Sequence, residues 1–343
     1  MIDVAINGFG RIGRCVARLC QDDPTLNLVA VNDVLADREN LAYLYNYDST
    51  YGRAAAPART SENANKLQID GSDIDFFSDA DISAVPWEAT GADVVIDASG
   101  VTRNVAGCQT LTKRGSVANA VVTHVPANDI DRYLIMGIND TAFDPTTDSV
   151  VSSSICDANA IAHVLQVLDT HLGLVSGFVT TLHPWLSYQN LLDKPLSSQA
   201  NPGHYWSDYS LGRASMGTLI PKKTTAISAL GPVMPEIAER ISAFSYRVPT
   251  AIVASADMTL KVAKSASRDE VAAILENFAS NSPYVTTNHE SLTAIDYVGT
   301  AWSATIDMQW TEVKDDMIKV VLWYDNEWGY ASRVLDVVRH IAA

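Results

Sequence analysis

The chain has 343 residues, and because a domain usually holds ~100–200 residues, this length predicts about two domains rather than one core. Hydrophobic residues make up 47% and charged residues 19% of the composition, which excludes a disordered chain. The 40 acidic residues outnumber the 24 basic ones and give a net charge of −16, so nucleic acid and membrane surfaces are not expected as main partners.

The N-terminal half alternates short apolar runs with stretches of helical spacing. The expected strands are residues 4–6, 28–31 and 94–97, and the expected helices after them are residues 11–22, 37–46 and 102–114. This alternation is typical of βαβ units, whose strands are buried on both faces and therefore lack a polar side. The first half is thus predicted to be an α/β unit with a Rossmann-type, doubly wound parallel sheet.

The pattern changes from about Val175 onward. Residues 251–262 and 304–310 alternate apolar with small or polar side chains, as strands with one solvated face do. Such strands suit an antiparallel or mixed sheet that has helices on one face only. The second half is therefore predicted to be an α+β unit with a mixed or antiparallel sheet.

Helix and loop patterns complete this second half. Ser267 and Glu270 form a capping box ahead of an expected helix over residues 271–279. Stretches rich in Ser, Asn, Pro and Gly predict loops. These loops are expected at residues 195–208 and 281–289, and a C-terminal helix is expected within residues 328–343.

The N-terminal segment reaches glycine and arginine before any apolar run long enough for a signal peptide. No other segment approaches ~18 uncharged apolar residues, so we expect a cytoplasmic protein. The four cysteines show neither a disulfide framework nor metal-site spacing, and no metal is predicted. Cys15, Cys20 and Cys108 fall on expected helices and are assigned to core packing.

A glycine pattern directly follows the first expected strand and opens a helix. Gly8 permits a tight turn, Gly10 lets backbone N–H groups approach a pyrophosphate, and Gly13 allows close packing of helix on strand. Asp33 ends the next strand, 20 residues after Gly13, where a carboxylate accepts from a ribose 2′-OH and repels a 2′-phosphate. The pattern therefore predicts NAD rather than NADP; the alternative is an ordinary glycine turn with Asp33 as a surface charge.

Cys156 stands between an extended stretch and an expected helix over residues 158–169. A thiol at a helix N-terminus feels the positive end of the dipole, which predicts a lowered pKa and a nucleophilic thiolate. His183 follows an expected strand, from which its imidazole can pair with that thiolate and move a proton. The alternative for each residue is a purely structural role in the core.

Several motifs together resemble the phosphorylating glyceraldehyde-3-phosphate dehydrogenase family, in order and at family-like spacing over essentially the whole chain. The motifs are residues 6–14 (INGFGRIGR), 31–33 (VND), 47–53 (YDSTYGR), 136–139 (MGIN), the segment around Cys156, 247–250 (RVPT) and 323–330 (WYDNEWGY). The resemblance implies an NAD-binding domain of residues 1–151 completed by the C-terminal helix 328–343, a catalytic domain of residues 152–327, and a homotetramer.

The resemblance also implies roles for individual residues. Cys156 would attack the aldehyde to give a thiohemiacetal, and His183 would assist as a base while hydride passes to the nicotinamide, leaving a thioester that phosphate cleaves. Asn326 would hold the nicotinamide carboxamide, Tyr330 would pack nearby, and Arg247 would contact a substrate phosphate or inorganic phosphate. The remaining implied contacts are Arg11, Ile12 and Thr123 with the cofactor, and Thr224, Thr225 and Asp157 at the phosphate sites.

The sequence departs from the family at the phosphate sites. The family usually reads SNASCTTNC around its nucleophile, whereas this chain has Ile155 and Asp157 where a serine and a threonine help bind inorganic phosphate. Asp157 also places a negative charge beside the negatively charged phosphate and thiolate. The alternative interpretation is that Asp157 is a carboxylate at the helix start that interacts favourably with the helix dipole. Leu186 and Leu211 replace a further threonine and arginine.

Other residues offer replacements for these lost donors. Lys222 and Lys223 supply positive charge from new positions, or else are solvated surface. Aromatic residues suggest a more aromatic pocket, or an interface or core instead; they are Trp185, Tyr188, Tyr205, Trp206 and Tyr209.

The departures leave the substrate open. Glyceraldehyde 3-phosphate is the expected aldehyde, with inorganic phosphate as acyl acceptor. One alternative is the oxidation of erythrose 4-phosphate, or of another aldehyde whose thioester is cleaved by water. A further alternative is an inactive NAD-binding sensor or scaffold that keeps only the cofactor motif.

Overall fold

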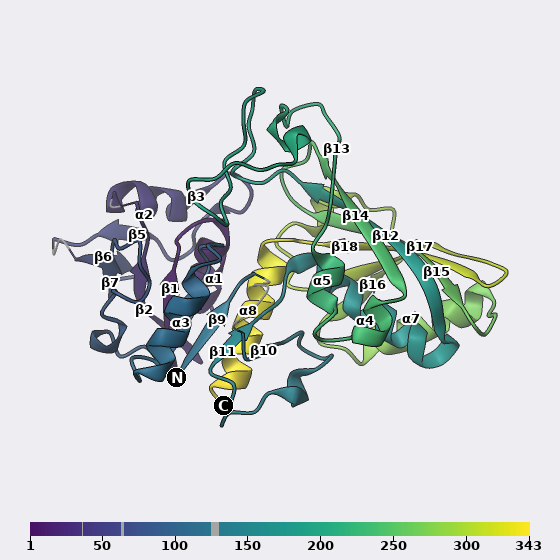
Figure 1. Cartoon of the computed structure of the whole chain (residues 1–343), viewed down its shortest axis with the longest axis horizontal. Helices are drawn as coiled ribbons and strands as arrows, with labels where there is room; N and C mark the ends of the chain where they lie inside the picture. The colour runs from purple at the N-terminus through teal and green to yellow at the C-terminus, as the bar shows by residue number, and fades with distance from the viewer. Residues whose placement is uncertain (36, 63–64, 125–129) are drawn as a thin grey trace.

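The computed structural model describes residues 1–35, 37–62, 65–124 and 130–343. Two sheets lie side by side, one in the purple-to-blue N-terminal half and one in the green half, with the C-terminal helix between them (Figure 1). None of the helices in these ranges has the length and apolar content that a membrane crossing requires. Short 3₁₀ turns lie at Trp87–Ala89, Asp140–Ala142, Tyr209–Gly212 and Ala294–Tyr297.

Among the described residues the first sheet has nine strands, and the predicted parallel, doubly wound arrangement is confirmed from β10 to β7. Two further strands, β6 and β5, add antiparallel pairs at one edge. In spatial order the strands are β10 (Arg132–Tyr133), β11 (Val150–Ser152), β9 (Asn119–Val122), β8 (Val94–Asp97), β1 (Ile2–Asn7), β2 (Leu26–Asn32), β7 (Ser72–Phe77), β6 (Lys66–Ile69) and β5 (Ala58–Thr60). A separate hairpin joins β3 (Tyr47–Asp48) to β4 (Gly52–Arg53).

Helices α1 (Arg11–Gln21), α2 (Arg38–Asn46) and α3 (Asn104–Lys113) belong to this half, near the predicted bounds. The C-terminal helix α8 (Trp328–Ile341) packs against α1 and shares one hydrophobic cluster with β1 and β2. Cys15, Cys20 and Cys108 are buried in the cores of this half, as the sequence predicted. The C-terminal helix α8 thus completes the hydrophobic core of the N-terminal half.

The second sheet has seven strands, and both parallel and antiparallel neighbours occur in it, which confirms the predicted mixed sheet. In spatial order they are β13 (Ile220–Lys222), β14 (Ile241–Val248), β12 (Leu174–Pro184), β15 (Ala254–Val262), β18 (Met317–Tyr324), β17 (Ala304–Lys314) and β16 (Val285–Asn288). The strand predicted at residues 251–262 begins only at Ala254, because Val253 takes a left-handed conformation with φ 68°.

The prediction of a loop over residues 281–289 is wrong for residues 285–288 and holds for the rest. Within it, β16 pairs in parallel with β17 and buries Val285 completely. The four residues of β16 are too few to show strand periodicity, and Ser, Asn and Pro surround them in the sequence. Their strand conformation comes from the hydrogen bonds that β17 offers at the sheet edge.

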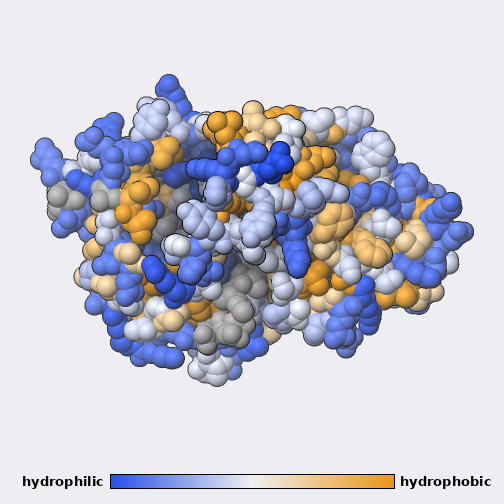
Figure 2. Space-filling model, turned by 45° about the horizontal axis from the view of Figure 1, so that its top comes forward, coloured by the Kyte–Doolittle hydropathy of each residue, from blue (hydrophilic) through white to orange (hydrophobic). Residues whose placement is uncertain are grey.

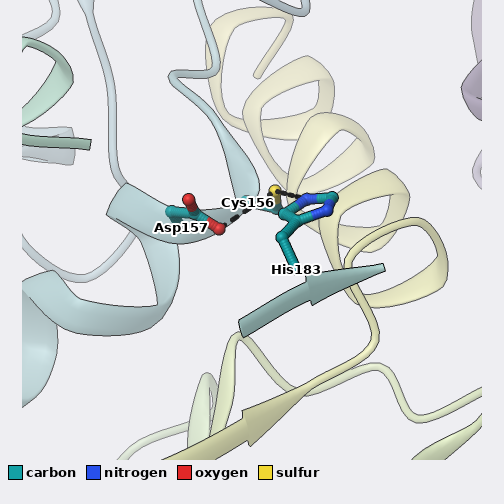
Figure 3. A group of neighbouring side chains, drawn as sticks. All are labelled: Cys156, Asp157 and His183. Atoms are coloured by element: carbon teal, nitrogen blue, oxygen red, sulfur yellow. Dashed lines mark hydrogen bonds between the residues drawn. The ribbon is translucent and has the colours of Figure 1, made fainter. Parts of the chain in front are cut away.

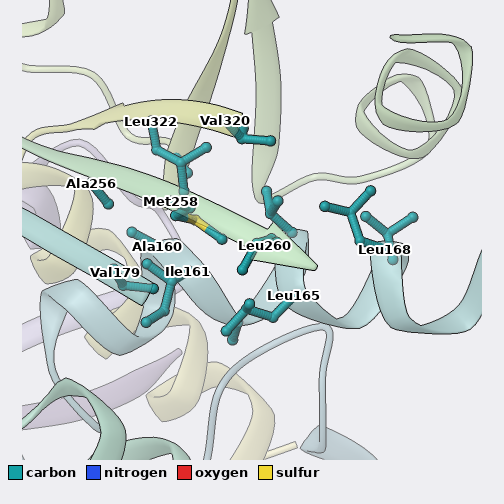
Figure 4. Packing of buried hydrophobic residues seen from close by; sticks show 14 of the residues in the cluster. Ala160, Ile161, Leu165, Leu168, Val179, Ala256, Met258, Leu260, Val320 and Leu322 are labelled. Atoms are coloured by element: carbon teal, nitrogen blue, oxygen red, sulfur yellow. The ribbon is translucent and has the colours of Figure 1, made fainter. Parts of the chain in front are cut away.

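Helices cover one face of the second sheet. They are α4 (Cys156–Leu172), α5 (Ala226–Leu230), α6 (Pro235–Ala238) and α7 (Arg268–Ser280), and α7 begins with the predicted Ser267–Glu270 capping box. Figure 4 shows Ile161, Leu165 and Leu168 of α4 packed against Met258 and Leu260 of β15. Burial of each such side chain is worth about 1.5–3 kcal/mol. This packing therefore holds α4 on the sheet and so fixes the position of its first residue.

His163 lies in the middle of α4 and is a buried titratable group. Both ring nitrogens lack hydrogen-bond partners among the described residues, and the ring stacks on Tyr284 with 5.8 Å between centroids. Burial, and then the charge of Arg333, lower the pKa of His163 to about 3. The unfolded chain therefore takes up a proton near the ordinary His pKa of about 6.5, whereas the folded chain does so only near pH 3.

Acidification should therefore destabilise the fold through His163. Between pH 7.5 and 5 this group alone is expected to remove about 2 kcal/mol from the free energy of unfolding. In the variant His163→Leu, the free energy of unfolding in urea should change less between these two pH values than in the wild type, by that amount. His171→Leu, an exposed histidine on the same helix, is the control; an unchanged pH dependence in His163→Leu would contradict the prediction.

Candidate active site

The glycine turn between β1 and α1 leaves no room for side chains at two positions. Gly8 has φ 92°, and a Cβ there would lie 2.7 Å from the Ser99 backbone. A Cβ on Gly13 would lie 2.1 Å from the Gly8 carbonyl oxygen. Gly10, by contrast, faces open space and precedes the first turn of α1 without a side-chain cap, so its surroundings admit an anionic group.

A groove of about 630 Å³ opens beside this turn. It lies where β1 has β2 on one side and β8 on the other, the point of an open parallel sheet at which the strand order reverses and dinucleotides bind. Its lining includes Gly8, Gly10, Asp33, Ser99, Arg103 and Gln199. The groove and the open space at Gly10 before α1 fit the dinucleotide that the sequence predicted.

Asp33 holds a fixed carboxylate at this groove. One oxygen accepts from the Phe9 N–H at 2.7 Å and the other from the Leu35 N–H at 2.9 Å. A carboxylate held in this way can accept from ribose hydroxyls and repels a 2′-phosphate, which fits NAD better than NADP.

Three other residues predicted to contact the cofactor lie outside the groove lining. The Arg11 guanidinium is paired with Asp48 and Glu327, so a cofactor contact of Arg11 would use its backbone. Ile12 belongs to the first turn of α1, and the Thr123 hydroxyl donates to the Asp97 carbonyl at 3.0 Å. Their cofactor roles stay predictions.

The residues after β18 point to a second part of the cofactor site. Asn326 is buried, and its Oδ1 lacks a hydrogen-bond partner among the described residues. An unpaired buried acceptor is costly unless a donor arrives, and an amide N–H such as that of a nicotinamide carboxamide fits it. The Tyr330 hydroxyl donates to the Ser154 carbonyl at 2.8 Å and lies 2.9 Å from Ser153 Oγ, so it fixes the turn before Cys156.

Cys156 and His183 are brought together from two elements. A turn links β11 to α4, with Ser154 in a left-handed conformation at φ 60°, and Cys156 is the first residue of α4. His183 stands near the end of β12, and its Nε2 lies 3.8 Å from Cys156 Sγ (Figure 3). Strained backbone of this kind concentrates at functional sites, and here it directs the thiol toward the imidazole.

The hydrogen bonds of His183 decide which nitrogen faces the thiol. Nδ1 lies 2.8 Å from the Pro184 carbonyl oxygen, which can only accept, so Nδ1 carries the proton. Burial, and then the charge of Arg247, lower the pKa of His183 to about 4. The imidazole is therefore neutral near pH 7, and its Nε2 lone pair is free to accept the Cys156 proton.

The prediction of a lowered pKa for Cys156 is wrong for this structure. Burial raises the pKa of the thiol well above its ordinary value, and the neighbouring Asp157 carboxylate raises it further, while Arg247 opposes them. The helix N-terminus favours the thiolate, but the loss of water costs more. The pair thus rests as neutral thiol and neutral imidazole.

Asp157 is buried in the site rather than exposed at a helix start. Its Oδ1 accepts from the Tyr324 hydroxyl at 2.7 Å, and its Oδ2 lies 3.4 Å from the hydroxyls of Thr181 and Thr224. Cys156 Sγ is 3.7 Å from Oδ1. The carboxylate is therefore held by three hydroxyl groups directly beside the thiol.

Two cations lie on the other side of the site. Arg247 of β14 pairs in register with His183, is buried, and has an Nε without a partner among the described residues. Lys222 of β13 is half-buried; burial and then Arg247 lower its pKa to about 8, although Asp157 counteracts them. Lys223 and Thr225 are exposed beside this pair. Arg247 and Lys222 therefore bring two positively charged side chains together beside His183.

One further departure, Leu211, belongs to a hydrophobic cluster separate from these residues. Leu211 is buried with Leu196 and Ile220 in a small cluster, on which Tyr188 and Trp206 also pack. Tyr205 and Tyr209 are exposed, so these two side chains are not enclosed in an aromatic pocket. Arg213 pairs with Asp193 at the surface.

Sequence reasoning missed Thr181 and Tyr324. Thr181 stands two residues before His183 on β12, and residues two apart share one face of a strand, so this spacing was a usable signal. Tyr324 reaches Asp157 from the last residue of β18, a contact between residues 167 positions apart that no local pattern indicates.

Two family descriptions match this sequence: "Glyceraldehyde 3-phosphate dehydrogenase, NAD binding domain" over residues 2–105 and "Glyceraldehyde 3-phosphate dehydrogenase, C-terminal domain" over residues 155–326. Glyceraldehyde-3-phosphate dehydrogenase 1 of Kluyveromyces lactis is 34% identical over 345 residues, which covers 100% of both chains. The cytosolic glyceraldehyde-3-phosphate dehydrogenase of Chlamydomonas reinhardtii is 32% identical over 99% of this chain and 97% of its own. Glyceraldehyde-3-phosphate dehydrogenase 1 of Nostoc sp. is 34% identical, with 98% and 96% covered.

Proposed function

Because this chain belongs to the glyceraldehyde-3-phosphate dehydrogenase family, it is an NAD-dependent oxidoreductase, and we propose that it oxidises glyceraldehyde 3-phosphate to an acyl phosphate through Cys156. The observation that carries this proposal is the 3.8 Å approach of Cys156 Sγ to the free Nε2 of His183, beside the buried cation Arg247. A nucleophile, a base and an anion site are the parts that phosphorylating aldehyde oxidation requires.

In the proposed mechanism, His183 Nε2 takes the thiol proton as Cys156 Sγ attacks the aldehyde carbon, and returns it to the new hydroxyl oxygen. NAD, when bound, supplies the acceptor for the hydride of that carbon. His183 removes the hydroxyl proton as the thioester forms on Cys156. Inorganic phosphate then attacks the thioester carbon, and the departing sulfur regains a proton from His183.

The anion site supports the phosphate chemistry. Arg247 and Lys222 are proposed to hold the substrate phosphate or the attacking phosphate, since charge-assisted hydrogen bonds to an anion are worth about 1.5–3 kcal/mol each. Thr224 lies beside them and, by releasing Asp157, can donate its hydroxyl to an anion. Thr225 is proposed as a contact from the adjacent exposed position.

The same proposal covers the organisation and location of the chain. Residues 1–151 with the C-terminal helix 328–343 are proposed as the NAD-binding domain and residues 152–327 as the catalytic domain. The packing of α8 on α1 supports this division. A cytoplasmic location is proposed because a cytosolic relative covers nearly the whole chain.

Steady-state NADH formation tests the proposed reaction. The purified protein is given glyceraldehyde 3-phosphate with and without inorganic phosphate, and erythrose 4-phosphate in parallel. We expect glyceraldehyde 3-phosphate to have the higher kcat/KM and its turnover to require phosphate. Equal rates without phosphate would indicate hydrolysis of the thioester, and inactivity with both sugars would overturn the proposed substrate.

The substitution Asp157→Thr is expected to improve the use of phosphate. It removes a carboxylate that repels the anion and that raises the pKa of Cys156, and it restores a hydroxyl donor. Since one hydrogen bond to a charged group is worth about 1.5–3 kcal/mol, the KM for phosphate should fall roughly tenfold or more. Asp157→Ala removes the charge without adding a donor and should give only part of this gain; an unchanged KM in both variants would contradict the prediction.

Homotetramer formation is proposed from the second sheet. The face of β12 and β14 away from the helices exposes apolar side chains, among them Phe178 at 69% and Phe244 at 42% exposure. Figure 2 shows hydrophobic patches on the half of the molecule that holds this sheet. Exposed apolar side chains gathered on one sheet face favour a protein interface there.

Light scattering of purified variants tests this interface. The wild type is expected to have the mass of four chains, and Phe178→Asp is expected to yield smaller species because a charge would be buried. Ile295→Asp, at an equally exposed apolar residue outside β12 and β14, should leave the mass unchanged. A monomeric wild type would refute the proposed assembly.

A further inference from the structure

Three different metal-ligating groups meet at the start of α4. Cys156, Asp157 and His183 each offer one ligand atom within 4.8 Å of the others, and the sulfur lies between carboxylate and imidazole in Figure 3. Sγ is 3.7 Å from Asp157 Oδ1 and 3.8 Å from His183 Nε2. Tetrahedral Zn²⁺, with bonds of about 2.3 Å to sulfur and about 2.0–2.1 Å to nitrogen or oxygen, requires separations of roughly 3.6 Å. The two distances from sulfur are therefore close to those of a tetrahedral zinc site, and the carboxylate and the imidazole, which lie within 4.8 Å of each other, draw together on binding.

Outer hydrogen bonds already orient two of the three ligands. His183 donates its Nδ1–H to the Pro184 carbonyl at 2.8 Å, which leaves the Nε2 lone pair available to a metal. The Tyr324 hydroxyl donates to Asp157 Oδ1 at 2.7 Å and holds the carboxylate beside the thiol. Metal-binding histidines and carboxylates are usually held by partners of this type.

Charge and ligand softness define the ion. A thiolate and a carboxylate balance a divalent charge, and a thiolate with an imidazole favours Zn²⁺ over Mg²⁺ or Ca²⁺. The positive charges of Arg247 and Lys222 weaken the attraction of this site for a cation, but the two side chains do not occupy the ligand atoms of Cys156, Asp157 and His183. Cys156 is only partly buried, so a fourth position can take water.

We propose that Cys156, Asp157 and His183 form a binding site for a thiophilic divalent cation, with Zn²⁺ the best match, which reversibly blocks the nucleophile of the proposed reaction. On binding, the S–H bond breaks, a metal–sulfur bond forms, and the proton leaves to solvent because Nε2 is taken by the metal. No oxidation or reduction takes place. Only the blocking effect rests on the proposed function; the binding itself does not.

Titration of the full-length protein with Co²⁺, a spectroscopic substitute for Zn²⁺, tests this proposal without aldehyde or NAD. We expect one equivalent to produce a thiolate-to-cobalt charge-transfer band, to release about one proton, and to be displaced by Zn²⁺. Cys156→Ser should abolish the band. Loss of outer partners alone costs metal sites about 10–100-fold in affinity, so Asp157→Asn and His183→Gln should each weaken binding at least tenfold.

Glu276→Gln is the matched control, because it disrupts the exposed Glu276–His289 pair, at 3.4 Å the natural place for weak surface binding. Its Co²⁺ affinity should equal that of the wild type. Absence of the band, or unchanged affinity in both Asp157→Asn and His183→Gln, would overturn the proposal. If either variant fails to fold, as judged by circular dichroism, the other carries the test. Inactivity with an intact cobalt band would instead count against the proposed function alone.

Discussion

Replacement of Cys156 by serine is expected to lower kcat with glyceraldehyde 3-phosphate by at least about 10⁴-fold, because the variant has no sulfur to form the thioester. NAD affinity should be unchanged, since the glycine turn and Asp33 lie in the groove on the first sheet. Initial rates of NADH formation and calorimetric titration with NAD measure the two quantities.

A second thiol provides the control for this prediction. Cys108 is buried on α3 in the core of the first half, and Cys108→Ala should lower stability while leaving kcat within a few fold of the wild type. Full turnover in Cys156→Ser would reject the proposed mechanism. A loss of NAD affinity in that variant would show that the substitution disturbs more than the nucleophile.

The variant His183→Asn is expected to lose about 10²–10⁴-fold in kcat/KM near neutral pH, the usual contribution of a positioned base. In the wild type the base has a pKa of about 4, so kcat/KM should stay nearly constant across neutral pH. Without the base, attack must wait for ionisation of a thiol whose pKa is raised by burial. The rate of the variant should therefore rise steadily with pH.

The shape of the pH profile separates this role from a structural one. A variant that merely loosened the site would lose rate at every pH in the same proportion. A parallel, uniformly lowered profile for His183→Asn would thus contradict proton transfer by His183, whereas a slope toward alkaline pH would support it.

The elements near the glycine turn were predictable because their information is local. Gly8, Gly10 and Gly13 lie within one turn, where the backbone conformation of Gly8 and the close contacts at Gly8 and Gly13 exclude other residues at these two positions. The apolar runs of the first half specify buried parallel strands. Ser267 and Glu270 lie three residues apart and form the capping box that marks the start of α7. The prediction missed β16 because the information for that strand is not local: its conformation depends on pairing with β17.

The candidate active site was predictable in its thiol and imidazole but not in its electrostatics. The sequence placed Cys156 at a helix start and proposed His183 as its partner, and the fold brings them within 3.8 Å. Nothing local to Asp157 indicated Tyr324 as its hydrogen-bond partner. The register of β12 with β14 sets Arg247 beside His183, and that neighbour helps to lower the pKa of the histidine.

The amino-acid sequence by itself therefore determined the two kinds of sheet, the dinucleotide turn and the two residues proposed as nucleophile and base, since backbone conformation and periodic burial are encoded by neighbouring residues. Only the tertiary structure decided the protonation of Cys156 and His183, the enclosure of Asp157 and the burial of Arg247 with an Nε that has no hydrogen-bond partner among the described residues. The physical reason is that desolvation and charge–charge interaction depend on which distant segments exclude water around a group, and side-chain spacing along the chain carries no measure of that.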